Sequence, residues 1–322
     1  MKRIVTIGGG TGQFALLSGL KTIPDLDITA IVTMADSGGS SGVLRTERGA
    51  LPPGDILRCL LALATADDDV VAMYQYRLTA GGGVGGHTVG NILLTAAAEQ
   101  QGGDFLAGIE THAKVLKPRG RVLPVTTDDV QLYARLADGT VLHGEHEIDG
   151  PVHDARSRIA DVWLEPRAAA RPEAIAAIAS ADAIIAGPGD LFTSIIPNVL
   201  VDGLADAARV APGRLVFVVN AMTKRGETDG YSTRDFVLAF ERYVGRPVDV
   251  VICNTQAPPM DVLERYQREG SEIVPSIIGN HTPVTTDCRW DERRIVPFPL
   301  LGAGPLARHD PTKLAHVIRA LL

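Results

Sequence analysis

Short apolar runs alternate with helix-like repeats along most of the chain. Runs rich in β-branched and apolar residues predict strands over residues 3–7, 28–34, 183–186, 215–219 and 248–253. Apolar positions at helical spacing predict helices over residues 11–21, 56–64, 88–99, 172–180, 193–209, 233–243 and 311–322. This alternation predicts an α/β fold, with a Rossmann-like doubly wound and mainly parallel sheet that carries helices on both faces.

The middle of the chain has a different pattern. Residues 121–148 show short apolar and polar alternations around a turn at 137–139, which predicts a β-hairpin or small antiparallel sheet. We therefore expect one domain over residues 1–322, with a β-rich insertion at 118–165. His143, Glu145, His146 and Glu147 resemble a metal-binding cluster, but strand alternation would turn His146 away from the other three. An exposed hairpin is the interpretation that we favour for them.

Composition excludes several classes of partner. The 322 residues are 45% apolar and carry a net charge of −7, so there is no broad basic field for nucleic acid or an anionic membrane. We see neither a signal peptide nor an apolar run long enough to span a membrane. We expect a cytoplasmic protein that does not insert into a membrane, and any anionic ligand must find a local pocket.

The first candidate site is the glycine run that follows the first strand. Gly9, Gly10, Thr11 and Gly12 stand between this strand and a helix, where backbone N–H groups can approach a phosphate closely. Gly10, Gly12 and Ala15 also fit the G-x-G-x-x-A dinucleotide pattern. A nucleotide-type ligand is predicted, although a purely structural turn would also need glycine.

A polar segment, residues 36–42, follows the second strand and is predicted to be a loop. Asp36 stands where a carboxylate could bind a ribose hydroxyl or a magnesium ion. Candidate contacts to phosphate oxygens are Ser37, Gly39, Ser40 and Ser41. The alternative is a mobile surface loop in which Asp36 is a turn residue.

Two further segments add titratable groups. Asp55, after Pro52-Pro53-Gly54, is either a helix N-cap or a second carboxylate beside Asp36 for a metal or substrate. His87 and Asn91 stand at the start of the next predicted helix, where an imidazole could meet an anion or transfer a proton. An ordinary loop histidine is the alternative.

The second half repeats the strand–glycine–helix arrangement. Gly187, Gly189 and Thr193 form a second candidate anion site, unless they are only a tight turn with Thr193 as the cap. Asn220 and Asn254 each end a strand and could read a base or a sugar, or could simply bond to their own backbone. Thr223 lies in the long polar segment 220–231, which we interpret as a possible lid.

Together these segments resemble the gluconeogenesis factor family, the YvcK-like proteins, and more distantly the CofD 2-phospho-L-lactate transferases. The matching pieces are GGGTG at 8–12, ITAIVTMADSGGSSGVLR at 28–45, LPPGDI at 51–56, GGHTVGNILL at 85–94, GPGDLFTSIIPNVLV at 187–201 and NAMTKRGETDGYS at 220–232. The resemblance implies a Rossmann-like core with a smaller inserted region, and binding of UDP-N-acetylglucosamine. It also implies a role in cell shape and wall synthesis on gluconeogenic carbon sources, with no firmly attached reaction.

The CofD resemblance implies a different function, the magnesium-dependent transfer of a phospholactyl group from a nucleotide to a deazaflavin. In that case Asp36 and Asp55 would hold magnesium and His87 would lie near the anionic group. Ser37 stands where the YvcK-like motif usually has a second acid, which weighs against transfer chemistry. A dinucleotide-dependent oxidoreductase is a third hypothesis, supported only by the glycine pattern.

The leading hypothesis is therefore a cytosolic regulator that binds a UDP-sugar and is not an enzyme. Magnesium is the only cofactor that the sequence suggests. A homodimer is expected only from the general frequency of symmetric dimers.

Overall fold

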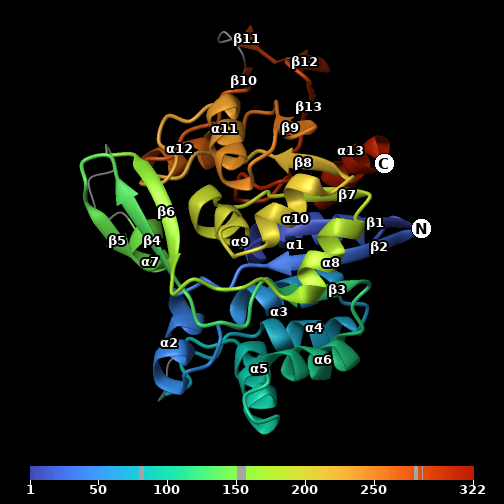
Figure 1. The fold of residues 1–322 in the computed structure, drawn as a ribbon, viewed down its shortest axis with the longest axis vertical. Helices are drawn as coiled ribbons and strands as arrows, with labels where there is room; N and C mark the ends of the chain where they lie inside the picture. Colours follow the sequence, from blue (N-terminus) through green and yellow to red (C-terminus); the bar gives the residue numbers. More distant parts are fainter. Residues whose placement is uncertain (80–82, 151–156, 279–281, 285) are drawn as a thin grey trace.

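An eight-stranded sheet runs through the centre of the molecule (Figure 1). The computed structural model describes residues 1–79, 83–150, 157–278, 282–284 and 286–322. In spatial order the strands are β12 (Cys288–Trp290), β13 (Arg293–Phe298), β9 (Val250–Asn254), β8 (Arg214–Val218), β7 (Ala183–Ala186), β1 (Lys2–Gly8), β2 (Leu26–Val32) and β3 (Arg121–Pro124). Only the β12–β13 pair is antiparallel. The predicted α/β class and mainly parallel sheet are confirmed.

Two layers of helices cover this sheet. The chain moves from β1 to β2 in one direction along the sheet, and from β7 through β8 to β9 in the other. Because such crossovers are right-handed, the connecting helices lie on opposite faces. One group that packs together comprises α1 (Gly10–Leu20), α3 (Gly54–Leu63) and α13 (Pro311–Leu321). The other comprises α8 (Pro172–Ser180), α9 (Ile196–Val199), α10 (Leu204–Val210) and α11 (Thr233–Val244).

The central strands are buried because both faces are covered. Ile4 and Ile7 of β1 and Ile184 of β7 have no exposed surface, as expected for a parallel sheet between helices. On the side of α11, the rings of Phe217 and Phe240 stack with their centroids 4.9 Å apart. The apolar runs seen in the sequence thus form one continuous core.

Several smaller elements surround this core. In the lower part of Figure 1, α4 (Asp68–Gln75), α5 (Val89–Gln100) and α6 (Phe105–Leu116) form a cluster beside α3. Near the opposite end lie α12 (Met260–Arg268) and the short pair β10 (Ile277–Ile278) and β11 (Thr282–Pro283). No helix in the described ranges has the length and apolar character required to cross a membrane.

The middle segment forms a small separate sheet, which projects at the left of Figure 1. Its antiparallel order is β5-β4-β6, with β4 (Gln131–Leu136), β5 (Val141–His143) and β6 (Ile159–Glu165). The predicted small antiparallel sheet is confirmed. The first strand of the predicted segment 121–148, β3, is not part of this small sheet. It pairs instead with β2 at the edge of the main sheet.

The prediction of a loop over residues 36–42 was wrong in its second half. A helix, α2 (Gly39–Arg48), begins within it and ends at Gly49, which has a left-handed φ of 61°. Glycine and serine are poor residues inside a helix, but serine is well tolerated in a first turn. Leu44 and Arg45 then provide a buried side. Because the apolar positions of this helix begin only after its polar first turn, residues 36–42 alone gave no helical pattern.

The single helix predicted over residues 193–209 was also wrong. The chain forms a π-helical turn, η1 (Leu191–Ile195), then α9, and breaks before α10. At the break, the backbone of Asp202 exchanges hydrogen bonds with Ala168 and Ala170, with N–O distances of 2.8 and 2.9 Å. Gly203, with φ 94°, then redirects the chain. A long-range backbone pairing therefore overrode the local helical pattern.

Candidate functional site

The predicted site segments meet at the carboxyl edge of the main sheet. β1 and β7 are neighbours, and the chain leaves them toward opposite sides of the sheet. This is the switch point at which open α/β sheets bind ligands. The glycine loops at 8–12 and 187–189 follow these two strands directly, and Asp36 follows the adjacent β2. Asn254 ends β9, two strands away from β7.

The glycines of the first loop allow protein segments to approach one another. A Cβ on Gly9 would stand 2.8 Å from both Asp55 Oδ2 and Ser194 Oγ. On Gly12 it would overlap the backbone carbonyl of Pro188. These distances are shorter than real Cβ contacts, so only glycine fits. The loops after β1 and β7 therefore pack directly against each other, and the structural role of these glycines is explained without a ligand.

Asp55 lies at the N-terminus of α1, beneath that loop. It is in the first turn of its own helix, whose N-cap is Pro53, so it does not cap that helix. Its carboxylate instead accepts a hydrogen bond from the Gly10 backbone. Burial, together with the nearby negative charge of Asp36, raises the pKa of Asp55 to about 7, although Arg58 and the Gly10 bond act in the opposite direction.

Sequence reasoning missed Arg58, which lies one helical turn after Asp55. Its guanidinium donates a hydrogen bond to the hydroxyl of Thr11 and remains exposed. Arg58 is three residues after Asp55, so the two side chains lie on the same face of α3. That spacing is visible in the sequence, but only the tertiary structure places Arg58 against the glycine loop. An exposed guanidinium at this position is suited to bind a phosphate.

The N-terminus of α2 supplies a second set of polar groups. Asp36 Oδ1 accepts a hydrogen bond of 2.9 Å from the Gly38 N–H. The amides of Gly39 and Ser40 lie in the first turn, where an α-helix has no internal acceptors for them. An open depression of about 320 Å³ adjoins this turn and is lined by Ser37, Gly39, Gly42, Val43, Thr46 and Glu47. There is therefore room beside these groups for a ligand.

Three predicted side chains form a network between α2 and α5. Ser40 Oγ lies 2.8 Å from His87 Nδ1 and accepts a hydrogen bond of 2.9 Å from Asn91 Nδ2. Nearby, Ser41 Oγ accepts a hydrogen bond of 3.2 Å from the Gly54 N–H. The residues of two distant motifs are thus in direct contact.

The prediction of an exposed hairpin at residues 143–147 is confirmed at His143 and wrong from Glu145 on. β5 ends at His143 and the chain turns into the short helix α7 (Glu145–Asp149). The helical turn points Glu145 toward Asp36. The pKa of Glu145 is raised to about 8, mainly by burial and also by repulsion from Asp36, Asp149 and Asp55. Ser37 anchors this helix, because its Oγ accepts a hydrogen bond of 3.1 Å from the His146 N–H.

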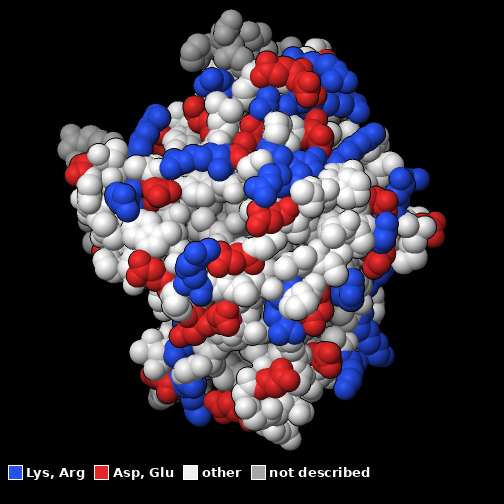
Figure 2. All heavy atoms as spheres, viewed as in Figure 1, with Lys and Arg blue, Asp and Glu red and all other residues white. Residues whose placement is uncertain are grey.

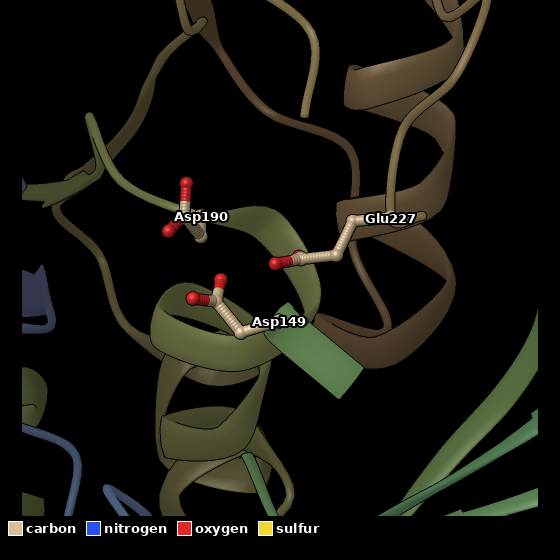
Figure 3. Close-up of side chains that lie close together, drawn as sticks. All are labelled: Asp149, Asp190 and Glu227. Carbon is tan, nitrogen blue, oxygen red and sulfur yellow. The ribbon is translucent and has the colours of Figure 1, made fainter. Parts of the chain in front are cut away.

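A second acidic group lies at the other end of α7. Figure 3 shows Asp149, Asp190 and Glu227 pointing toward one another from three different segments. The ammonium of Lys224 forms ion pairs with Asp149 and with Asp190, the latter at 2.8 Å. Burial and the charge of Asp190 raise the pKa of Glu227 well above its usual value. Burial alone would lower the pKa of Lys224, but these acids raise it.

The carboxylates at this site are of the kind that can bind a magnesium ion. Oxygen atoms of Asp149, Asp190 and Glu227 lie within 4.8 Å of one another, and carboxylates are ligands that Mg²⁺ accepts. Lys224 already forms ion pairs with two of these acids, so a metal there would have to displace an ammonium. Asp36, which the sequence proposed as a metal ligand, is near enough to Asp55 to raise its pKa and thus offers a second position.

Other predicted contacts are engaged within the protein. Asn220 Oδ1 accepts a hydrogen bond from the Gly189 N–H at 3.0 Å, and the Thr193 hydroxyl donates to Glu227 at 3.0 Å. The Thr223 hydroxyl accepts from the Glu272 N–H at 2.8 Å. The side-chain amide of Asn254 bonds to backbone groups of Gln256 and Leu300. These side chains hold neighbouring loops together. Of the alternatives considered from the sequence, only the local backbone bonding of Asn254, to Gln256, is found; Asn220 bonds to the distant Gly189, and Thr193 does not cap its helical turn.

Charge is mixed over the face drawn in Figure 2. Basic and acidic side chains are interspersed there, and no broad basic field is visible on that face. This agrees with the net charge of −7.

The arrangement is shared with known proteins. The family model for 2-phospho-L-lactate transferase CofD matches residues 4–285. A gluconeogenesis factor of Bacillus subtilis is 38% identical over 322 residues, covering 99% of this chain and 98% of that protein. Another, from Halalkalibacterium halodurans, is 41% identical over 283 residues and covers 87% and 85%.

A solved structure shares the fold as well. A crystal structure of a protein from Bacillus halodurans superposes with a TM-score of 0.90 at 36% identity, covering 99% of both chains. The strand order, the inserted sheet and the site segments lie within this shared length. The chain therefore belongs to the CofD family and, within it, to the gluconeogenesis factors.

Proposed function

We propose that this protein is a cytoplasmic regulator that binds a nucleotide-sugar similar to UDP-N-acetylglucosamine. In this role it would adjust the supply of cell-wall precursors and maintain cell shape on gluconeogenic carbon sources. The observation that carries the proposal is the convergence of Arg58, the first turn of α2 and Asp36 at the switch point of the sheet. This supports the proposal because the chain is related to gluconeogenesis factors over nearly its whole length.

Each part of such a ligand has a matching group. The diphosphate would meet the Arg58 guanidinium and the amides of Gly39 and Ser40 in the first turn of α2. Sugar or ribose hydroxyls would donate to Asp36 and accept from Asn91. Because the face drawn in Figure 2 carries no broad basic field and the net charge is −7, affinity would come from these few directed groups.

Calorimetric titration of the full chain with UDP-N-acetylglucosamine tests this proposal. We expect binding that is lost, or weakened at least ~10-fold, in Asp36→Ala and in Arg58→Ala, since a hydrogen bond to a charged group contributes about 1.5–3 kcal/mol. The matched control is Glu110→Gln, an exposed position on α6 away from the site. Absence of UDP-sugar binding to the folded protein, or equal binding by all four proteins, would overturn the proposal.

A second function is favoured by one observation. The match to the phospholactate transferase family model coincides with carboxylates that meet from three segments, Asp149, Asp190 and Glu227, a set suited to magnesium-assisted transfer from a nucleotide. Its signature would be tight binding of GDP that requires magnesium, together with turnover of nucleotide-activated lactate and a deazaflavin. UDP-sugar binding without either effect would exclude it.

A further inference from the structure

The contact between Ser40 and His87 has the geometry of an activated nucleophile. Their Oγ and Nδ1 atoms are 2.8 Å apart, within the range for proton transfer between a hydroxyl and a base. Asn91 Nδ2, which can only donate, lies 2.9 Å from the same Oγ. With the amide donating to this oxygen, the hydroxyl donates its own proton to the imidazole in the tautomer that leaves Nδ1 unprotonated.

The base is held in place while the hydroxyl stays reachable. His87 and Asn91 are each only 5% exposed, whereas Ser40 is half-buried. The His87 carbonyl accepts a hydrogen bond of 2.9 Å from the Leu78 N–H, and Thr88 caps α5 next to it. The imidazole therefore has little freedom to leave the hydroxyl.

The surroundings favour an attack on phosphorus. Ser40 is the second residue of α2, and Asn91 is the third residue of α5, so two helix N-termini face the same oxygen. Their partial positive charges stabilise an alkoxide and the negative charge that develops on a phosphoryl group. This region adjoins Asp36 and the open depression beside Gly39.

We propose that Ser40 is a nucleophile, with His87 as its general base, that takes a phosphoryl group from a phosphoric ester or anhydride. In this step the Oγ–P bond forms and the bond from phosphorus to the leaving oxygen breaks. The hydroxyl proton passes to His87 Nδ1. From an anhydride the leaving group departs as a phosphate, and from an ester it departs as an alcohol that takes its proton from solvent water. The product is a covalent phosphoseryl protein, a property that goes beyond reversible binding of a nucleotide-sugar.

A fluorophosphonate probe tests this step without knowledge of the natural ligand. With the probe, the Oγ–P bond forms, the P–F bond breaks and fluoride leaves. We expect one phosphonyl group per full-length chain, found on Ser40 by peptide mass spectrometry. Ser40→Ala should not be labelled there, and His87→Gln should react at least ~100-fold more slowly, the usual contribution of a general base. Ser180→Ala, at the half-buried C-terminal end of α8, is the matched control and should react like the wild type.

Thermal unfolding of each variant separates loss of the base from loss of the fold. The proposal is overturned if the folded wild type is not labelled at Ser40, or if His87→Gln reacts at the wild-type rate. The network would then only connect α2 to α5 structurally. Titration of the same preparations with UDP-N-acetylglucosamine keeps the two proposals apart. Binding without labelling overturns the nucleophile alone, and labelling without binding overturns the nucleotide-sugar proposal alone.

Discussion

Replacing Asp55 with asparagine should stabilise the protein at high pH and leave its stability almost unchanged at low pH. Asparagine keeps an oxygen that can accept the hydrogen bond from the Gly10 backbone, but it removes a charge that burial and Asp36 disfavour. The pKa of Asp55 rises from 3.8 to about 7 on folding. Between these values the folded state binds more protons than the unfolded state, so the free energy of unfolding of the wild type falls as pH rises.

The size of the effect follows from the shift. Each pKa unit corresponds to about 1.4 kcal/mol, so ionised Asp55 destabilises the fold by up to about 4 kcal/mol above pH 7. The difference in unfolding free energy between Asp55→Asn and the wild type should therefore grow from near zero at pH 4 toward that limit at pH 8. Glu145, whose pKa is about 8, contributes its own decline to the stability of both proteins. Because Asp55 is one of the charges that raise this pKa, the decline is smaller in Asp55→Asn, which adds to the difference near pH 8.

Denaturant titrations at five pH values between 4 and 8 would measure this difference. Glu110→Gln, an acid-to-amide change at an exposed position of α6, serves as the matched control and should show no such growth with pH. A difference that is constant over the whole range would refute the reasoning. So would a variant that is less stable than the wild type at pH 8, because the carboxylate would then stabilise the fold. A concurrent loss of UDP-sugar affinity would indicate that the unfavourable charge is retained for binding.

Two more predictions concern packing and charge at the site. Gly12→Ala should lower the free energy of unfolding by about 1–3 kcal/mol, because the added Cβ would overlap the Pro188 carbonyl. The matched control is Gly304→Ala, whose Cβ would have no atom within 4 Å and which should change that free energy little in the same denaturant titration. Lys224→Met should destabilise the protein by about 1–3 kcal/mol, less than for a fully buried pair because the lysine side chain is 30% exposed. Adding Asp149→Asn should restore part of that loss, and a double-mutant cycle showing no coupling would contradict the ion-pair assignment.

Much of the fold could be predicted because its signals are local. The buried central strands are visible in the sequence as runs of β-branched residues. The apolar spacing likewise predicted α8, α11 and α13. The glycine loops followed the predicted strands, so their position at one edge of the sheet was also predictable. In contrast, α2 and the break before α10 were missed, since a polar first turn and a long-range backbone pairing leave no local apolar pattern.

The sequence by itself determined the order of the buried central strands and of most helices that cover them, and hence a parallel sheet with polar groups gathered at its carboxyl edge. Only the tertiary structure decided which of those groups touch. It placed Arg58 against Thr11, Asp55 beneath the amide of Gly10, and Glu145 of the inserted segment toward Asp36. Periodicity reports how one element faces the core, but contacts between loops depend on how separate elements pack, which no local pattern encodes.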